Sequence, residues 1–203
     1  WGAKAANYTL ANLNTTTANI TAKPITVTAE AKTKVYGETD PALTYTLSAA
    51  ALATGDNVTG ALSRATGEGV GTYAIGQNTL TAGTNYSITY VPANLQITRK
   101  VLVITAENKN RNFGVANPAL TATYSGFVGT ETAAVLTSPV VLSTTATVTS
   151  TAGNYPITAS GAAAANYSIT YVAGTLTVNP TSQTITFAAL PNKLDTDGTF
   201  TLT

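Results

Sequence analysis

Short stretches of alternating apolar and polar residues run along most of the chain. In the stretch 86–91, tyrosine and isoleucine alternate with serine and threonine, and in the stretch 25–29 isoleucine, valine and alanine alternate with threonine. A period of two places the apolar side chains of a strand on one face of a sheet. Turn-forming residues separate such stretches, for example at 55–57, 67–69 and 117–118. The pattern predicts an all-β protein made of short strands.

This pattern occurs twice in the chain. The segment NYSITYV at 85–91 recurs, letter for letter, at 166–172. Upstream, Tyr36-Gly37 matches Phe113-Gly114, and the two are followed by DPALT at 40–44 and NPALT at 117–121. Matching positions differ more in residue number at the NYSITYV segments than at the aromatic-glycine steps. We therefore expect an insertion of about five residues in a surface loop between Thr130 and Ser150.

The repetition divides the chain into four predicted parts. Residues 1–24 resemble the closing strands of a preceding repeat, 25–99 and 100–179 are two repeat domains, and 180–203 resemble the opening strands of a following repeat. Each repeat has the size of a small β-sandwich-like domain. Junctions of two or three residues that contain proline should be stiff hinges. The fold class predicted is therefore tandem small β-sandwich-like repeat domains in an elongated array, cut from a longer polypeptide.

Composition narrows the functions that this chain can have. Among 203 residues there is no His and no Cys, so the usual pairs of nucleophile and base are missing, and we expect no enzymatic activity, no catalytic residues and no cofactor-binding residues. Charged residues make up 9% of the chain, the net charge is +1, and no basic cluster indicates binding to nucleic acid. The sequence has no apolar stretch of about 18 residues, so we do not expect this segment to insert into a membrane.

Acidic residues offer one metal hypothesis. Asp195-Thr196-Asp197-Gly198 is similar to the start of a Ca²⁺-binding loop, which places Asp195 and Asp197 as Ca²⁺ candidates. No closing glutamate follows before Thr203, so we expect a polar turn there in preference to a metal site, and no bound cofactor. At Asp40-Pro41 we expect a turn in which the aspartate caps its own backbone.

The ten tyrosines raise the question of sugar binding, since exposed rings can stack on sugars. Most of them recur at matching strand positions, which favours packing in the core with the hydroxyl near the rim. We therefore expect core positions for Tyr86, Tyr90, Tyr167 and Tyr171. Tyr36 and Phe113, each next to a glycine, are expected to be packing residues as well.

Taken together, four features resemble the MBG-type and YDG-type repeats of very large bacterial adhesins, including those of biofilm matrices. They are the opening strand ITVTA at 25–29, the aromatic-glycine steps, the Asp/Asn-Pro-Ala-Leu turns and the closing NYSITY strands. The resemblance covers about residues 20 to 180. It implies an extracellular, repetitive and mainly structural module on a bacterial cell surface, and the family has no catalytic residues to carry over.

Two functions follow as hypotheses, and association between repeats of neighbouring cells through neutral, threonine-rich edge strands is a third possibility. The first is a stalk or spacer of a large bacterial cell-surface adhesin, supporting cell adhesion and biofilm formation, whose partners are the neighbouring repeats of the same polypeptide. The alternative is an adhesive module that binds exopolysaccharide or host glycans, with the loop from Thr130 to Ser150 as the place to look, because binding loops differ between copies of a repeat.

Overall fold

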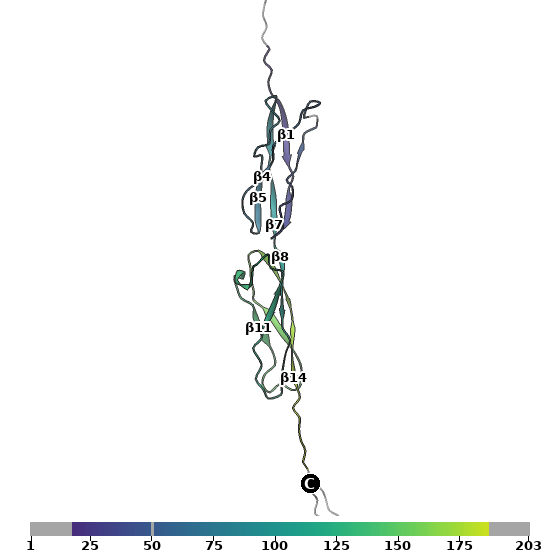
Figure 1. The fold of residues 1–203 in the computed structure, drawn as a ribbon, viewed down its shortest axis with the longest axis vertical. Coiled ribbons are helices and arrows are strands. Elements are labelled where there is room, and N and C mark those ends of the chain that lie inside the picture. The colour runs from purple at the N-terminus through teal and green to yellow at the C-terminus, as the bar shows by residue number, and fades with distance from the viewer. Residues whose placement is uncertain (1–17, 50, 187–203) are drawn as a thin grey trace, which may run out of the picture. The chain divides into compact units, whose positions relative to one another are not determined.

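The computed structural model describes residues 18–49 and 51–186 of the chain. Strands dominate it, and they fall into two sets of seven that follow the two sequence repeats (Figure 1). The first repeat contains β1 Lys23–Ala29, β2 Lys32–Val35, β3 Tyr45–Leu47, β4 Ser63–Arg64, β5 Gly71–Gly76, β6 Tyr86–Val91 and β7 Ala93–Thr98. The second contains β8 Lys100–Ala106, β9 Lys109–Asn112, β10 Ala122–Ser125, β11 Val141–Thr144, β12 Gly153–Ser160, β13 Tyr167–Val172 and β14 Gly174–Asn179, together with a 3₁₀ turn, η1 Ala133–Val135.

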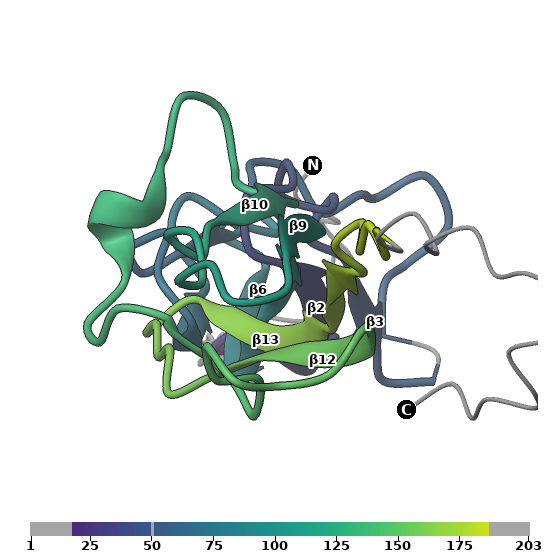
Figure 2. The ribbon, with the colours of Figure 1, turned by 90° about the horizontal axis from the view of Figure 1, so that it is seen from below.

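Each repeat folds its strands into two sheets. In the first repeat the strand orders are β3-β1-β6 and β2-β7-β5-β4, and in the second they are β10-β8-β13 and β11-β12-β14-β9. Figure 2 shows β12 and β13, which belong to different sheets of the second repeat. Strand β1 pairs with β6 in parallel, β2 pairs with β7 in parallel, and the remaining pairs of the first repeat are antiparallel. The prediction of an all-β fold of tandem sandwich-like repeats is confirmed.

The alternation of the sequence explains which side chains lie inside. Along β1 the burial follows a period of two, with Ile25, Val27 and Ala29 buried. Their counterparts along β8 are buried in the same way. Burying an isoleucine, leucine or valine side chain fully contributes about 1.5–3 kcal/mol, so matching apolar positions give the two repeats matching cores. The equivalent buried pairs are Ile25 and Leu102, Val27 and Ile104, Ala29 and Ala106, Ile75 and Ile157, Leu95 and Leu176, and Ile97 and Val178.

The compact units of the chain do not coincide with the two repeats. Among the described residues, unit 1 consists of those up to Val101 together with Gly126–Thr137 and Ala164–Ser168. Unit 2 consists of Leu102–Ser125, Ser138–Ala163 and the described residues from Ile169 onward. Two segments of the second sequence repeat therefore belong to the same compact unit as the whole first repeat.

Two further observations bear on the ends of the chain and on membranes. No strand is assigned within 180–186, the part of the last predicted segment that the structure describes. In residues 18–49 and 51–186 we find no helix with the length and apolar character that a bilayer crossing needs.

Candidate functional site: a buried cation cluster and a tyrosine–glutamate cluster

The first polar cluster lies in the first repeat and is called here the cation cluster. It consists of Lys34 on β2, Asp40 in the loop after β2, Arg64 on β4 and Glu68 in the loop before β5. Lys34 occupies an inward position of its strand, so its stem lies in the core and only 3% of its side chain is exposed. A buried ammonium has to be paired and hydrogen-bonded to be tolerated.

The cluster provides that pairing. Lys34 Nζ donates to Asp40 Oδ1 at 2.6 Å, to Glu68 Oε2 at 2.6 Å and to the main-chain oxygen of Glu38 at 3.2 Å. Arg64 binds the same two carboxylates, donating to Asp40 Oδ2 at 2.6 Å and to Glu68 Oε1. Its guanidinium also lies over the ring of Tyr73, 5.3 Å from the ring centre. The two cations and two anions thus form a closed network.

The network shifts the pKa values of its members in the directions that such pairing requires. Hydrogen bonds from Arg64 and Lys34 lower the pKa of Asp40 to about 2. Hydrogen bonds from Lys34 and Arg64 also lower the pKa of Glu68. For Lys34, the hydrogen bonds to the two carboxylates raise the pKa despite the opposing effect of burial. All four groups are therefore charged at neutral pH.

The second repeat buries a cation at the matching position but surrounds it differently. Arg111 on β9 is the counterpart of Lys34 and is 5% exposed. Its Nε donates to Asn117 Oδ1 at 2.7 Å, and its other nitrogens donate to the main-chain oxygens of Asn112 and Thr147. Asn117, the counterpart of Asp40, also donates to the main-chain oxygen of Ala146 at 2.7 Å. Each of these partners of the guanidinium is a neutral oxygen.

The second polar cluster belongs to unit 1 and is called here the tyrosine–glutamate cluster. It consists of Tyr36, which follows β2, Glu131 and Phe127 in segment 126–137, and Tyr167 in segment 164–168. Both tyrosine hydroxyls donate to the carboxylate of Glu131: that of Tyr36 to Oε1 at 2.6 Å, and that of Tyr167 to Oε2. The ring of Tyr167 makes edge contacts with Tyr36 at 5.5 Å and with Phe127 at 5.6 Å between ring centres.

Further contacts hold the same segments together. The hydroxyl of Tyr167 accepts the main-chain N–H of Val128 at 2.9 Å, and the side-chain oxygen of Asn166 accepts the main-chain N–H of Val70 at 2.9 Å. Next to Tyr36, the backbone of Gly37 approaches Val128 so closely that an added Cβ would clash with the methyl groups of Val128. Gly37 also has φ +84°, which favours glycine.

The pKa values in this cluster report a shared anion. Hydrogen bonds from the hydroxyls of Tyr167 and Tyr36 lower the pKa of Glu131. Burial, together with the hydrogen bond to Glu131, raises the pKa of Tyr167 to about 12. The hydrogen bond to Glu131 also raises the pKa of Tyr36. At neutral pH one carboxylate therefore binds two neutral hydroxyls, an arrangement suited to fixing segments of chain against one another.

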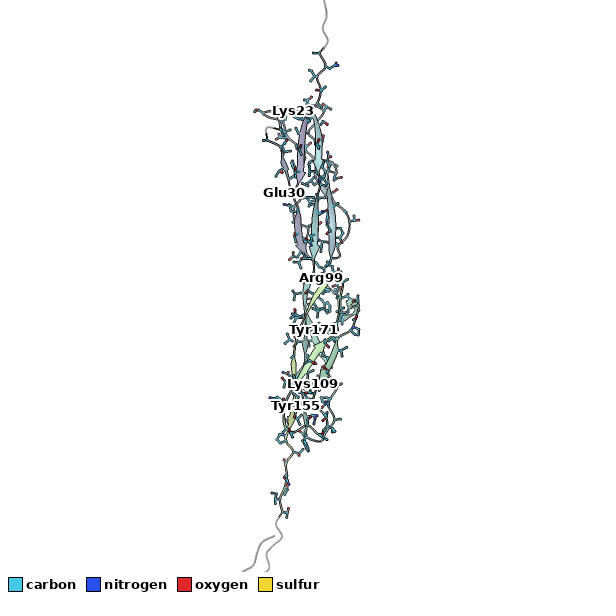
Figure 3. All side chains as sticks on the ribbon, turned by 180° about the vertical axis from the view of Figure 1, so that it is seen from behind. Lys23, Glu30, Arg99, Lys109, Tyr155 and Tyr171 are labelled. Atoms are coloured by element: carbon cyan, nitrogen blue, oxygen red, sulfur yellow. The ribbon has the colours of Figure 1, made fainter. Side chains whose placement is uncertain are left out.

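The structure changes some expectations about single residues. Asp40 does not cap its own backbone, because its two carboxylate oxygens accept from Lys34 and Arg64. Tyr167 is buried as expected, whereas Tyr171 is 36% exposed and its hydroxyl donates to the main-chain oxygen of Ala162 (Figure 3). Phe113 is 44% exposed and so does not fill a core position. The Ca²⁺ candidates Asp195 and Asp197 lie outside the described residues.

Metal binding and the loop insertion can be placed more closely. Within the described parts of the chain, no group of three or more acidic side chains is arranged to hold a metal ion.

The insertion expected between Thr130 and Ser150 is spread along the chain, and it includes η1. The offset between matching positions grows in steps: it is smallest at Asp56 and Glu131, larger at Ser63 and Ser143, and largest at Tyr73 and Tyr155.

Sequence reasoning missed the buried cations and the role of Glu131. A signal for the cations was present, because Lys34 and Arg111 are long cationic side chains at matching positions of the two repeats. No comparable signal existed for the pairing of Tyr36 with Glu131, which are 95 residues apart in the sequence.

Comparison with known proteins bears on both repeats. A search of the curated proteins finds none that matches this chain. The family model described as MBG domain (YGX type) matches the chain twice, at residues 25–96 and at residues 102–177. The two matches cover the first and second repeats, and the aromatic-glycine steps at Tyr36 and Phe113 lie inside them.

Proposed function

The chain belongs to the family of MBG domains of the YGX type, and on this premise we propose that it is a stalk or spacer segment of a large bacterial cell-surface adhesin. In that role it supports cell adhesion and biofilm formation by holding other parts of the polypeptide away from the cell. The segment is extracellular, performs no catalysis and has the neighbouring repeats of the same polypeptide as its partners.

The observation that carries this proposal is the composition of unit 1. This unit joins the whole first repeat to two segments of the second repeat, and Glu131 binds tyrosines from both repeats within it. A spacer has to resist bending and pulling where one repeat passes into the next. A half-buried carboxylate with two hydroxyl partners, supported by aromatic edge contacts, supplies such resistance beyond that of the short linker.

Solution scattering of the whole chain tests the mechanical part of the proposal. Strands β6 and β7 follow one another with a single residue between them, and the extended stretch 86–98 at roughly 3.3 Å per residue reaches up to about 40 Å. A spacer of two repeats placed end to end should therefore have a maximum dimension of about 70 Å or more. Glu131→Ala should broaden the distribution of dimensions, because it removes the shared acceptor of Tyr36 and Tyr167. Glu107→Ala, at an exposed carboxylate of the second repeat, is the matched control and should leave it unchanged. A single compact globule in which the repeats fold back on each other would overturn the spacer role.

Replacement in the parent adhesin tests the cellular part. Deleting residues 23–179 should reduce attachment of intact cells while the rest of the adhesin remains detectable on the surface by antibody. Inserting an unrelated rigid spacer of equal length should restore attachment. If only the original sequence restores it, the segment contributes binding of its own.

A glycan-binding module is the second candidate, favoured by one observation. The inserted region between Thr130 and Ser150 presents apolar side chains to solvent, with Val135 36% and Val148 47% exposed. Such positions can pack against sugar faces. Binding of the chain to a panel of exopolysaccharides and host glycans, compared with a Val135→Ser, Val148→Ser variant that leaves Glu131 intact, tests it. Saturable binding that the variant loses would support this function, and an unaffected variant would remove this loop as the site.

A further inference from the structure

The part of the tyrosine–glutamate cluster that comes from the second repeat has a counterpart in the first repeat. Tyr86 is the counterpart of Tyr167, and its hydroxyl accepts the main-chain N–H of Ala53 at 2.9 Å and donates to Asp56 Oδ2 at 2.6 Å. In the second repeat, the hydroxyl of Tyr167 accepts from Val128 and donates to Glu131 in the same way. The spacing from Ala53 to Asp56 equals that from Val128 to Glu131.

The main chain beside these tyrosines is also fixed alike. The oxygen of Asn85 accepts the N–H of Lys23 at 2.8 Å, and that of Asn166 accepts the N–H of Lys100 at 3.1 Å. We call the set Val128, Glu131, Asn166 and Tyr167 the second socket, and the set Ala53, Asp56, Asn85 and Tyr86 the first socket. The same receptor geometry is therefore built once in each repeat.

The two sockets differ in how much of them is open to solvent. In the second socket Tyr167 is 4% exposed, because Tyr36 and Phe127 pack against its ring. In the first socket Tyr86 is only half-buried, and Asp56 and Asn85 are exposed. Glu131 uses one oxygen for each tyrosine, whereas the bond from Tyr86 uses Oδ2 of Asp56 and leaves Oδ1 as the counterpart of the oxygen that binds Tyr36.

The group that enters the second socket is an aromatic-glycine tip, and the chain has a second one. Tyr36 and Gly37 form the first tip, and Phe113 and Gly114 form the second. Phe113 is 44% exposed, and among the described residues nothing lies within 4 Å of a Cβ added at Gly114, although its φ of +80° is close to that of Gly37. The first tip thus contacts the second socket within unit 1, whereas the second tip and the first socket face solvent.

We propose that the first socket binds the aromatic-glycine tip of a second copy of this chain, with Phe113 of one copy lying against Tyr86 of the other. Tip and socket are different surfaces, so the contact between two copies is head-to-tail. Phe113 supplies the edge contact that Tyr36 makes with Tyr167, but it has no hydroxyl for Asp56. The association goes beyond a spacer role and does not depend on it.

The contact is small, so its affinity between separate chains should be weak. Within one chain the linker holds tip and socket at a high effective concentration, whereas two chains have to meet by diffusion. We expect a Kd on the order of 1 mM, because the tip offers one ring and little else. Restoring the hydroxyl with Phe113→Tyr should tighten binding about 3- to 10-fold, the range of a single hydrogen bond to a solvent-exposed carboxylate.

Two complementary variants allow this contact to be measured without growth of longer assemblies. The receptor is ¹⁵N-labelled full chain with Phe113→Ser, which has a first socket and no aromatic tip. The donor is unlabelled full chain with Asp56→Ala, which has a tip and an impaired socket. Neither change touches Tyr36, Glu131 or Tyr167, and unchanged amide signals elsewhere in each variant show that the fold is retained.

Titration followed by NMR then decides the proposal. Donor should shift the receptor amides near 53–56 and 85–86 in a saturable manner, and a donor that also carries Phe113→Tyr should do so at about 3- to 10-fold lower concentration. A donor that also carries Phe113→Ser should cause no shift. Adding Asp56→Ala to the receptor should abolish the advantage of the Phe113→Tyr donor. No shift at these amides with about 1 mM of the Phe113→Tyr donor, or equal shifts with the Phe113→Ser donor, would overturn the proposal.

Discussion

The two repeats have matching strands and matching apolar cores but different polar interiors. In the first, the buried ammonium of Lys34 is held by the carboxylates of Asp40 and Glu68, which Arg64 shares. In the second, the buried guanidinium of Arg111 is held by the amide of Asn117 and by main-chain oxygens. A buried cation requires hydrogen-bond acceptors, but those acceptors need not be charged. The choice of charged acceptors makes the stability of the first repeat depend on pH and salt.

The largest difference should come from removing the side-chain acceptor in each repeat. Asp40→Ala leaves two cations short of a charged partner, and one of them, Lys34, is almost fully buried, so we expect a loss of about 2–3 kcal/mol in the first repeat. Asn117→Ala removes one neutral acceptor of Arg111, which keeps its two main-chain acceptors, and should cost the second repeat about 1.5 kcal/mol. Hydrogen exchange of amides in β5 and β12, followed by NMR, measures both. Equal losses would contradict the distinction between charged and neutral interiors.

The glycines of the two tips give the next largest contrast. Both Gly37 and Gly114 have positive φ, so alanine at either position costs about 1 kcal/mol in backbone strain. Gly37→Ala also places a methyl group against Val128, so its cost should reach about 2 kcal/mol or more. Denaturant unfolding of the two single variants compares them. If Gly114→Ala is as costly as Gly37→Ala, the close approach to Val128 does not contribute to stability.

Acid should weaken the first repeat more than the second. The pKa of Asp40 is lowered to about 2 and that of Glu68 is lowered as well, so their contribution is present above the ordinary carboxyl range and is lost as the pH falls from about 4 to about 2. Asp40 is 41% exposed, and allowing for solvent screening its share should be about 1 kcal/mol. Hydrogen exchange at pH 6 and at about pH 3 measures the difference between β5 and β12.

Other carboxylates titrate in the same range and have to be separated. Glu30 and Glu107 stand at matching positions, each paired with a lysine and a threonine, so their effects on the two repeats should cancel. Glu131 also has a lowered pKa and belongs to unit 1. A variant with Asp40→Asn and Glu68→Gln isolates the cation cluster. If the acid sensitivity of β5 persists unchanged in this variant, the cluster is not its source.

Salt should give the smallest contrast. The carboxylates of the cation cluster are partly exposed, so about 1 M sodium chloride should screen their attraction to Lys34 and Arg64 and lower the stability of the first repeat by about 0.5 kcal/mol. The neutral acceptors of Arg111 should leave the second repeat nearly unaffected. Urea unfolding at low and high salt, with signals from each repeat resolved, tests this. A larger salt effect in the second repeat would reverse the comparison.

Sequence patterns predicted the strands well because the cause of the pattern is local. Strand β1 covers the predicted opening stretch, and the identical segments at 86–91 and 167–172 became β6 and β13. Tyrosine positions were predicted less well. The alternation that places a ring on the inner face does not say how far the facing sheet extends over it, and so Tyr167 is buried while Tyr171 is exposed.

By itself, the sequence determined the repeat, the all-β class and the apolar cores, because the period of two and the match between copies can be read from the order of the residues alone. Tertiary structure decided which polar groups meet. Lys34 and Glu68 are 34 residues apart and Tyr36 and Glu131 are 95 apart. Their pairing depends on how sheets and loops pack, and a hydrogen bond forms only within about 3 Å, a precision that residue spacing along the chain cannot supply.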